Sequence, residues 1–154
     1  MMKFKRNIYN LCATLGPIGY LPAPGTCATV VSLSSVYFVK YLQLTLLQEF
    51  FLLFVITGAS YFIVSQALVF FTSDDPSEIV LDELVGTLWV FIGLPLSPYV
   101  VISSIIIFRF FDITKLGISF FEKLPGAVGV LSDDIVAALI TNGIMHMIVM
   151  WYGF

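Results

Sequence analysis

Long stretches without a charged residue constrain this chain more than any other feature of its sequence. Residues 50–71 and 135–154 contain no Asp, Glu, Lys or Arg, and each is about as long as the ~20 apolar residues that cross a bilayer as a helix. Residues 84–108 are also uncharged but are interrupted by Gly93, Pro95 and Pro98, and residues 26–48 carry a single lysine. This pattern predicts several membrane-embedded helices.

The composition agrees with a membrane protein. Of the 154 residues, 59% are hydrophobic and 11% are charged, whereas a soluble domain carries about 25% charged residues. We predict an all-α fold, a polytopic helical membrane protein with about four to five membrane-embedded helices in a single domain over residues 1–154. The net charge of −3 does not indicate a nucleic-acid partner, and we expect none. The sequence leaves open whether the chain forms an oligomer.

Polar residues gather in four short islands between the apolar stretches. These islands cover residues 16–29, 72–83, 109–115 and 122–134. Nine of the ten acidic residues lie between Asp74 and Asp134, so the acidic charge is concentrated and not scattered.

Basic residues at the start of the chain set the expected topology. Because they precede the first span, Lys3, Lys5 and Arg6 favour a cytoplasmic N-terminus. The chain would then cross outward through residues 29–47, turn near Gln48 and Glu49, and return through residues 50–71. The second island would face the cytoplasm.

Residues 84–108 allow two arrangements, one broken span or a hairpin that turns at residues 95–98. Proline favours a turn there because it lacks an N–H and clashes with the preceding helical turn. Only the hairpin, with arms of about 15–18 residues, places the last three islands on one side of the membrane. The last helix, from Ile135, would leave to the far side, so we expect a polar site on the cytoplasmic face.

The second island contains the acidic pair Asp82 and Glu83, which apolar residues flank on both sides. A carboxylate in such surroundings is expected to have a partner or a function. Pro76 suits the first turn of a helix that Asp74 or Asp75 would cap. The earlier acids of this island can be explained by the helix dipole alone.

The third island has charges at a helical spacing of three, at Arg109, Asp112 and Lys115. One interpretation is a plain set of intrahelical ion pairs. The functional interpretation is that the two cations bind phosphate, while Asp112 either orients Arg109 or binds a metal.

The fourth island ends in Asp133 and Asp134, directly before an apolar run. Ser132 or Asp133 is expected to cap the last helix, which accounts for one aspartate more easily than for two. Gly126 and Gly129 predict a turn ahead of that helix, with N–H groups that could approach a phosphate.

The sequence lacks several motifs, and their absence excludes other phosphatase mechanisms and a phosphate-binding P-loop. Neither Cys12 nor Cys27 is followed six residues later by arginine, His146 is the single histidine, and the sequence has no Asp-x-Asp and no GxxxxGK[ST] loop. We interpret His146 as a packed polar residue. What remains is a set of carboxylates with Arg and Lys, and such oxygen ligands suit Mg²⁺, which acidifies water and polarises a phosphoryl group.

Four segments resemble, in order, the phosphatidylglycerophosphatase A family. They are LPAPGTCAT at 21–29, IVLDELVG at 79–86, FRFFDITK at 108–115 and GAVGVLSDDIVAA at 126–138. The resemblance implies a Mg²⁺-dependent phosphatase, multi-pass in the bacterial inner membrane, that hydrolyses phosphatidylglycerophosphate to phosphatidylglycerol and phosphate. This chain departs from the family after Lys115, where Leu116-Gly117-Ile118 replaces Pro-x-Pro-Ile.

The islands and the resemblance together assign the site. The metal ligands are Asp82, Glu83, Asp133 and Asp134; the catalytic residues are Asp82, Asp112 and Asp134; the substrate-binding residues are Arg109, Lys115 and Thr26. Water activated by the metal is the preferred nucleophile, and a carboxylate nucleophile is the alternative. The expected partners are the phospholipid substrate and the membrane.

Two other functions stay open at this point. A small cation channel or transporter subunit would also use intramembrane carboxylates, but it predicts acids within spans, whereas here they lie at span ends beside Arg109 and Lys115. A non-catalytic assembly protein would keep the motifs as structure.

Overall fold

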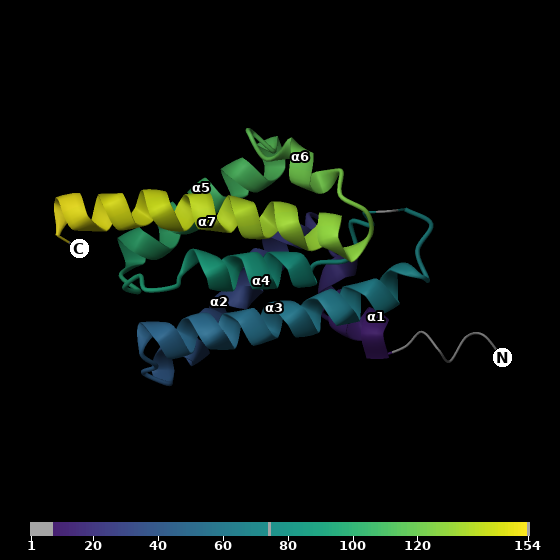
Figure 1. Ribbon diagram of the computed structural model, residues 1–154, viewed down its shortest axis with the longest axis horizontal. Coiled ribbons are helices and arrows are strands. Elements are labelled where there is room, and N and C mark those ends of the chain that lie inside the picture. Colours follow the sequence, from purple (N-terminus) through teal and green to yellow (C-terminus); the bar gives the residue numbers. More distant parts are fainter. Residues whose placement is uncertain (1–7, 74, 154) are drawn as a thin grey trace.

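The computed structural model describes residues 8–73 and 75–153, and every regular element within them is a helix (Figure 1). The elements are α1 (Ile8–Ala13), the 3-10 helix η1 (Ile18–Tyr20), α2 (Pro24–Tyr41), α3 (Leu46–Leu68), α4 (Leu81–Val90), α5 (Pro98–Thr114), α6 (Ser119–Glu122) and α7 (Ala127–Tyr152). The all-α prediction is confirmed. The basic residues that set the expected N-terminal orientation lie outside the described residues.

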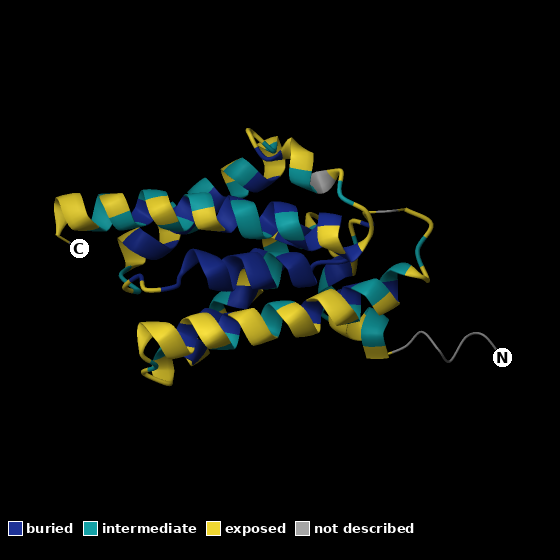
Figure 2. Ribbon diagram, viewed as in Figure 1, coloured by how far each residue is buried: buried dark blue, intermediate teal, exposed yellow. Residues whose placement is uncertain are grey.

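Helix α4 lies at the centre of the bundle, where it packs against α2, α3, α5 and α7. All of its residues except Glu83 and Leu84 are buried (Figure 2). Gly86 allows a close approach to two neighbouring helices, because a Cβ there would lie 2.8 Å from the Phe108 ring of α5 and 3.3 Å from the carbonyl oxygen of Asp134 in α7. The backbone of α4 therefore lies directly against α5 and α7 at the level of the acidic residues.

Residues 84–108 form the hairpin and not the single broken span. Helices α4 and α5 are joined through residues 91–97, and Pro98 occupies the first turn of α5. The Ser97 hydroxyl caps α5 by accepting the N–H of Val100 at 3.3 Å. Helix α5 has 17 residues, within the expected length.

Helix α4 is shorter than expected, with 10 residues. The helix predicted to begin at Pro76 does not form, since the described part of the second island before Leu81 contains turns and irregular backbone. Asp82 and Glu83 therefore stand in the first turn of α4. Asp74, one of the two expected caps, lies outside the described residues.

The turn between α4 and α5 obtains hydrogen-bond partners from α3 and α7. Gly93, with φ +68°, donates its N–H to Glu49 Oε2 at 3.2 Å, and Glu49 Oε1 lies 2.6 Å from Lys40 Nζ. The Asn142 side chain donates to two carbonyl oxygens at the end of α4, each at 2.9 Å. Non-helical backbone away from water requires such partners. We call Lys40, Glu49, Gly93 and Asn142 the distal cluster.

The connection between α2 and α3 lies earlier than expected. It covers residues 42–45, and not the neighbourhood of Gln48 and Glu49. Thr45 and Gln48 form a capping box, in which each side chain bonds the backbone N–H of the other, and this box starts α3 at Leu46.

The last helix also begins earlier than expected. Helix α7 starts at Ala127, with Gly126 as the residue before it, so neither Ser132 nor Asp133 caps it. Gly129 is a buried helical residue and does not form part of a turn. The two aspartates of the fourth island are carried inside α7 and not at its end.

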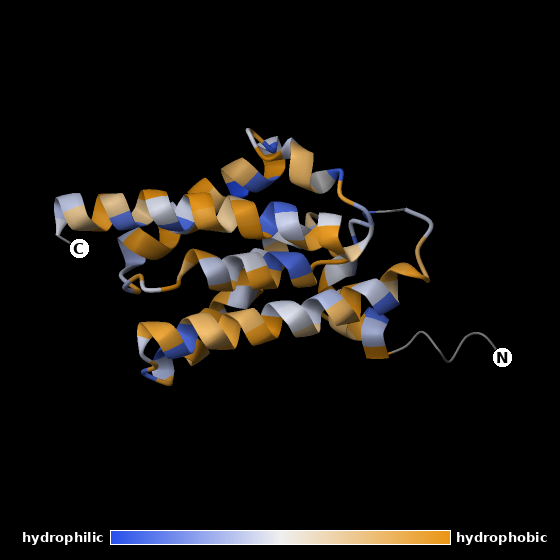
Figure 3. Cartoon of the chain, in the orientation of Figure 1, coloured by the Kyte–Doolittle hydropathy of each residue, from blue (hydrophilic) through white to orange (hydrophobic). Residues whose placement is uncertain are grey.

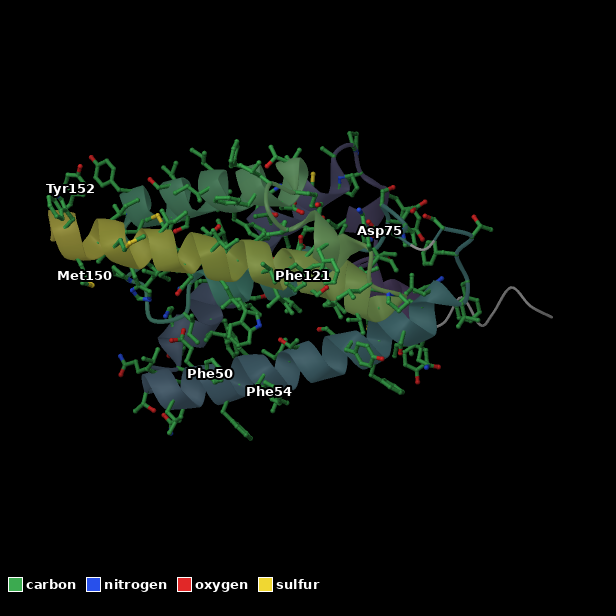
Figure 4. All side chains as sticks on the ribbon, turned by 45° about the horizontal axis from the view of Figure 1, so that its top comes forward. Phe50, Phe54, Asp75, Phe121, Met150 and Tyr152 are labelled. Carbon is green, nitrogen blue, oxygen red and sulfur yellow. The ribbon has the colours of Figure 1, made fainter. Side chains whose placement is uncertain are left out.

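Helices α3 and α7 are long and apolar enough to cross a membrane. In the most apolar 18 residues of each helix, 22% of the residues are buried. Figure 3 shows apolar residues along both helices, and large apolar side chains on both are exposed. Phe50 and Phe54 on α3 are labelled in Figure 4, and they are 50% and 66% exposed. Apolar faces of this extent indicate contact with lipid or protein. These two helices are candidate membrane spans, and four to five embedded helices stay a prediction.

Candidate active site

A pocket of about 360 Å³ lies at the end of the bundle where α2, α4 and α7 begin and α5 ends. Figure 3 shows hydrophilic residues gathered where α4 and α7 begin, and Figure 4 labels Asp75, which lines the pocket from the second island. Every residue assigned from the sequence lines it: Thr26, Asp82, Glu83, Arg109, Asp112, Lys115, Asp133 and Asp134. The hairpin thus brings all four islands together.

Three carboxylates form what we call the acidic centre of this pocket. Oxygen atoms of Asp82 and Glu83 on α4 and of Asp134 on α7 all lie within 4.8 Å of one another. Asp134 is 2% exposed and Asp82 is 9% exposed. One oxygen of each carboxylate, namely Asp82 Oδ1, Glu83 Oε2 and Asp134 Oδ2, is buried without a hydrogen-bond partner among the described residues. Burying a polar atom without a partner costs free energy of folding unless a ligand binds that atom.

The electrostatics of the acidic centre also favour a bound cation. Burial raises the pKa of Asp82 well above its ordinary range, and the charges of Glu83 and Asp134 raise it further. A positive charge at this point would allow the three carboxylates to ionise together. Because Mg²⁺ binds through a few carboxylate oxygens and keeps its other positions for water and phosphate, this donor set fits Mg²⁺.

The cations of the third island form a network beside the acidic centre. Arg109 Nη1 donates to Asp112 Oδ2, while Lys115 Nζ donates to Asp112 Oδ1 at 2.8 Å and to Asp133 Oδ2 at 2.6 Å. Both oxygens of Asp112 are therefore engaged. The network is more than a set of ion pairs within one helix, since Lys115 joins the end of α5 to α7.

Lys115 is held in a special position. It follows the last residue of α5 in the left-handed conformation, with φ +50°. Burial alone would lower the pKa of Lys115, but its hydrogen bonds to Asp112 and Asp133 outweigh burial and raise that pKa. Lys115 Nζ also lies 4.0 Å from Asp134 Oδ1, so its charge reaches the edge of the acidic centre.

Arg109 approaches the acidic centre from the other side. Its Nη1 lies 3.8 Å from Glu83 Oε1, a distance that supplies charge without a hydrogen bond. The Nε of Arg109 is buried and has no hydrogen-bond partner among the described residues. One N–H of this side chain is therefore left without an acceptor among those residues.

The two adjacent aspartates of α7 have different surroundings. Asp134 belongs to the acidic centre, whereas Asp133 accepts the Lys115 ammonium through Oδ2 and the backbone N–H of Asp134 through Oδ1 at 3.0 Å. The sequence alone assigned both to metal binding. The structure places Asp133 in the ion-pair network.

Comparison with known proteins decides the family. The chain matches the family model described as phosphatidylglycerophosphatase A over residues 11–149, a range that contains all four islands. The chain belongs to the phosphatidylglycerophosphatase A family. No solved structure matches this family member.

Three curated relatives accompany this family match. A putative phosphatidylinositol-3-phosphatase of Bacteroides thetaiotaomicron is 39% identical over 70 residues, which cover 43% of this chain and 44% of the relative. A phosphatidylglycerophosphatase A of Haemophilus influenzae is 38% identical over 80 residues, with 50% and 49% covered. That of Escherichia coli is 28% identical over 128 residues, with 81% and 73% covered. The chain thus spans about half the length of the first two relatives.

Gly25 and Ile113 are among the pocket residues of this phosphatidylglycerophosphatase A family member that the sequence reasoning did not assign to the site. Gly25 lines the pocket at the start of α2, and the signal for it was a proline-glycine pair opening a helix. Ile113 also lines the pocket and is 68% exposed, and nothing in its spacing distinguishes it from other apolar residues of α5.

The single histidine lies away from the pocket. A Cβ on Gly93 would come within 3.4 Å of the His146 ring, which places His146 beside the distal cluster. Its half-buried position there agrees with the interpretation as a packed polar residue.

Proposed function

We propose that this family member is a Mg²⁺-dependent lipid phosphatase that hydrolyses phosphatidylglycerophosphate to phosphatidylglycerol and inorganic phosphate. The observation that carries the proposal is the acidic centre, which shares a pocket with Arg109. Each of its three carboxylates has one buried oxygen without a hydrogen-bond partner within residues 8–73 and 75–153. The family match and the names of the Haemophilus influenzae and Escherichia coli relatives support this choice of substrate.

Asp82, Glu83 and Asp134 are the residues that would hold the metal. A bound Mg²⁺ supplies positive charge that polarises the phosphoryl group and acidifies water. The protein contributes a fixed geometry, because the carboxylates stand on two helices whose backbones meet closely at Gly86. Holding the reacting groups in place removes part of the entropic barrier. A metal-binding role for Asp133 stays a prediction.

Arg109 and Lys115 would balance the charge of the phosphate. Arg109 lines the pocket, and guanidinium groups bind phosphate through several donors. Lys115 is already engaged by Asp112 and Asp133, so we assign it mainly to holding α5 against α7. Because both oxygens of Asp112 bind these cations, its geometry favours positioning over direct contact with the substrate.

The surroundings of the pocket suit a lipid. Ile113 lines it and is exposed, so an apolar side chain stands beside a polar headgroup site. We propose a multi-pass protein of the bacterial inner membrane, with four to five embedded helices and the pocket at the cytoplasmic face. A reporter fused after Phe154 tests this topology, which predicts a C-terminus outside the cytoplasm; a cytoplasmic reporter would contradict it.

The test of function is phosphate release from phosphatidylglycerophosphate by the purified protein in detergent micelles. We expect turnover that requires Mg²⁺ and that Asp82→Asn abolishes. Glu78→Gln is the matched control, since Glu78 lies in the same island but outside the residues that line the pocket, and it should keep full activity. Turnover that survives Asp82→Asn, or that ignores Mg²⁺, would overturn the proposal.

Phosphatidylinositol 3-phosphate is the second candidate substrate, because the Bacteroides thetaiotaomicron relative carries the name of a phosphatase for that lipid. The same assay with both lipids decides between them by the ratio of their kcat/KM values. The channel alternative predicts ion flux in vesicles without phosphate release. It is less favoured because the acids of the pocket are accompanied by Arg109 and Lys115.

A further inference from the structure

The start of α2 differs from the starts of α3 and α5. Thr45 and Ser97 cap α3 and α5 with their side chains, whereas α2 follows Ala23, which makes no side-chain cap. Pro24 has no N–H, and the N–H groups in the first turn of a helix have no intrahelical acceptor. Gly25 and Thr26 therefore present the first backbone donors of α2.

These donors lie against the acidic centre and Arg109. A Cβ on Gly25 would be 2.1 Å from Glu83 Oε1 and 3.1 Å from each Nη of Arg109. Only glycine lets the helix start this close to both side chains. Gly25 and Thr26 line the same pocket as the acidic centre.

Independent evidence for a ligand comes from the carboxylates in that pocket. Asp134 and Asp82 are both at least nine-tenths buried, and each has an oxygen without a hydrogen-bond partner in the part of the chain that the structure describes. The pocket therefore contains anionic acceptors. Beside them, in contact with Glu83, it contains Arg109 and the start of α2, where the positive end of the helix dipole favours anions. A ligand with this polarity is a phosphate bound to a divalent cation.

We propose that the first turn of α2 is the phosphate-binding cradle of the pocket, in which the N–H groups of Gly25 and Thr26, the Thr26 hydroxyl and Arg109 bind the oxygens of a phosphomonoester dianion. The inference rests on the proposed function for its lipid substrate, but a lipid phosphate and free inorganic phosphate share this chemistry. Without an N-cap side chain to compete, the donors are left for the ligand.

Selective labelling can observe this contact directly. Protein labelled with [¹³C′]proline and [¹⁵N]glycine shows amide signals for glycines that follow proline, and the sequence has two such pairs, Pro24-Gly25 and Pro125-Gly126. Gly126 is the internal control, since it lies outside the residues that line the pocket. Pro125→Ala removes its label pair and so assigns the two signals.

With Mg²⁺ present, titration with inorganic phosphate should move the Gly25 amide proton downfield and leave Gly126 unchanged. A short-chain phosphatidylglycerophosphate should do the same at lower concentration if the lipid headgroup is the natural ligand; an equal or weaker response would assign the cradle to free phosphate. A Gly25 signal that stays fixed with both ligands overturns the cradle. If the Gly25 signal stays fixed while the protein still hydrolyses the lipid, the proposed function stands and the cradle is wrong. If phosphate shifts the Gly25 signal but the protein does not hydrolyse the lipid, the cradle stands and the proposed function is wrong.

Discussion

Two buried acidic sites lie at opposite ends of α4, and their partners differ. In the distal cluster, Glu49 is 6% exposed, and each of its oxygens has a partner, Lys40 for one and the Gly93 N–H for the other. In the acidic centre, Asp82 and Asp134 are similarly buried, but each has an oxygen without one among the described residues. A buried carboxylate whose oxygens are both paired is tolerated by the fold, and removing it leaves its partners unpaired. A buried carboxylate oxygen without a partner costs stability unless a ligand binds it.

The largest effect that tests this difference between the two acidic sites is expected at Asp134. Asp134→Asn should lower kcat/KM for phosphatidylglycerophosphate by at least about a thousandfold, which corresponds to ~4 kcal/mol of transition-state stabilisation. Thermal stability should be retained, because the amide fills the same volume and removes one like charge from the acidic centre. Micelle kinetics and thermal unfolding of the same preparation check both statements. A variant within tenfold of the unaltered protein would remove Asp134 from the site.

Lys115 provides a second test of the acidic centre, because it connects that centre to the ion-pair network. Lys115→Met should lower kcat by about 10–100-fold, the usual effect of losing a residue that orients metal ligands. Lys115→Arg should restore part of the loss, since it keeps the charge. Steady-state kinetics separate the roles: a rise in KM alone, at unchanged kcat, would show that Lys115 binds substrate and does not position Asp112 and Asp133.

Glu49 provides the opposite expectation. Glu49→Gln weakens the interaction with Lys40 and the N–H of Gly93, and it should lower the free energy of unfolding by about 1–3 kcal/mol. The specific activity of the folded protein should stay the same. Denaturant unfolding in micelles and activity per folded molecule test this. Lost activity with unchanged stability would mean that the distal cluster is not structural.

The smallest effect is expected at the apolar edge of the pocket. Ile113→Ser should raise KM for phosphatidylglycerophosphate in mixed micelles about fivefold, which corresponds to ~1 kcal/mol of lost apolar contact. A water-soluble phosphomonoester has no acyl chain to contact Ile113, so its KM should not change. Equal effects on both substrates would argue against a lipid contact at this residue.

Much of the site could be predicted from the sequence because charge is scarce in the chain. Buried charges need partners, so acids and cations in an apolar protein are expected to meet, and the pocket does contain Asp82, Asp134 and Arg109. The same reasoning, together with the prolines of residues 84–108, favoured the hairpin but left the single broken span open.

Local boundaries were harder to predict, because tertiary packing decided them. The residues around Pro76 are of types typical of a helix start, yet the backbone there is irregular and α4 begins at Leu81. Asp133 is of a residue type that commonly caps a helix, yet α7 begins six residues earlier, at Ala127. The different surroundings of Asp133 and Asp134 depend on their directions around α7 relative to Lys115. No single-sequence pattern contains that information.

The central claim is that the acidic centre holds Mg²⁺, and titration calorimetry with Mg²⁺ alone tests it most directly. The account predicts saturable Mg²⁺ binding to the purified protein, lost in Asp134→Asn and kept in Glu49→Gln. Only the first variant alters a carboxylate that has a buried oxygen without a hydrogen-bond partner among the described residues. Mg²⁺ binding that is the same in both variants, or lost in Glu49→Gln and kept in Asp134→Asn, would contradict it.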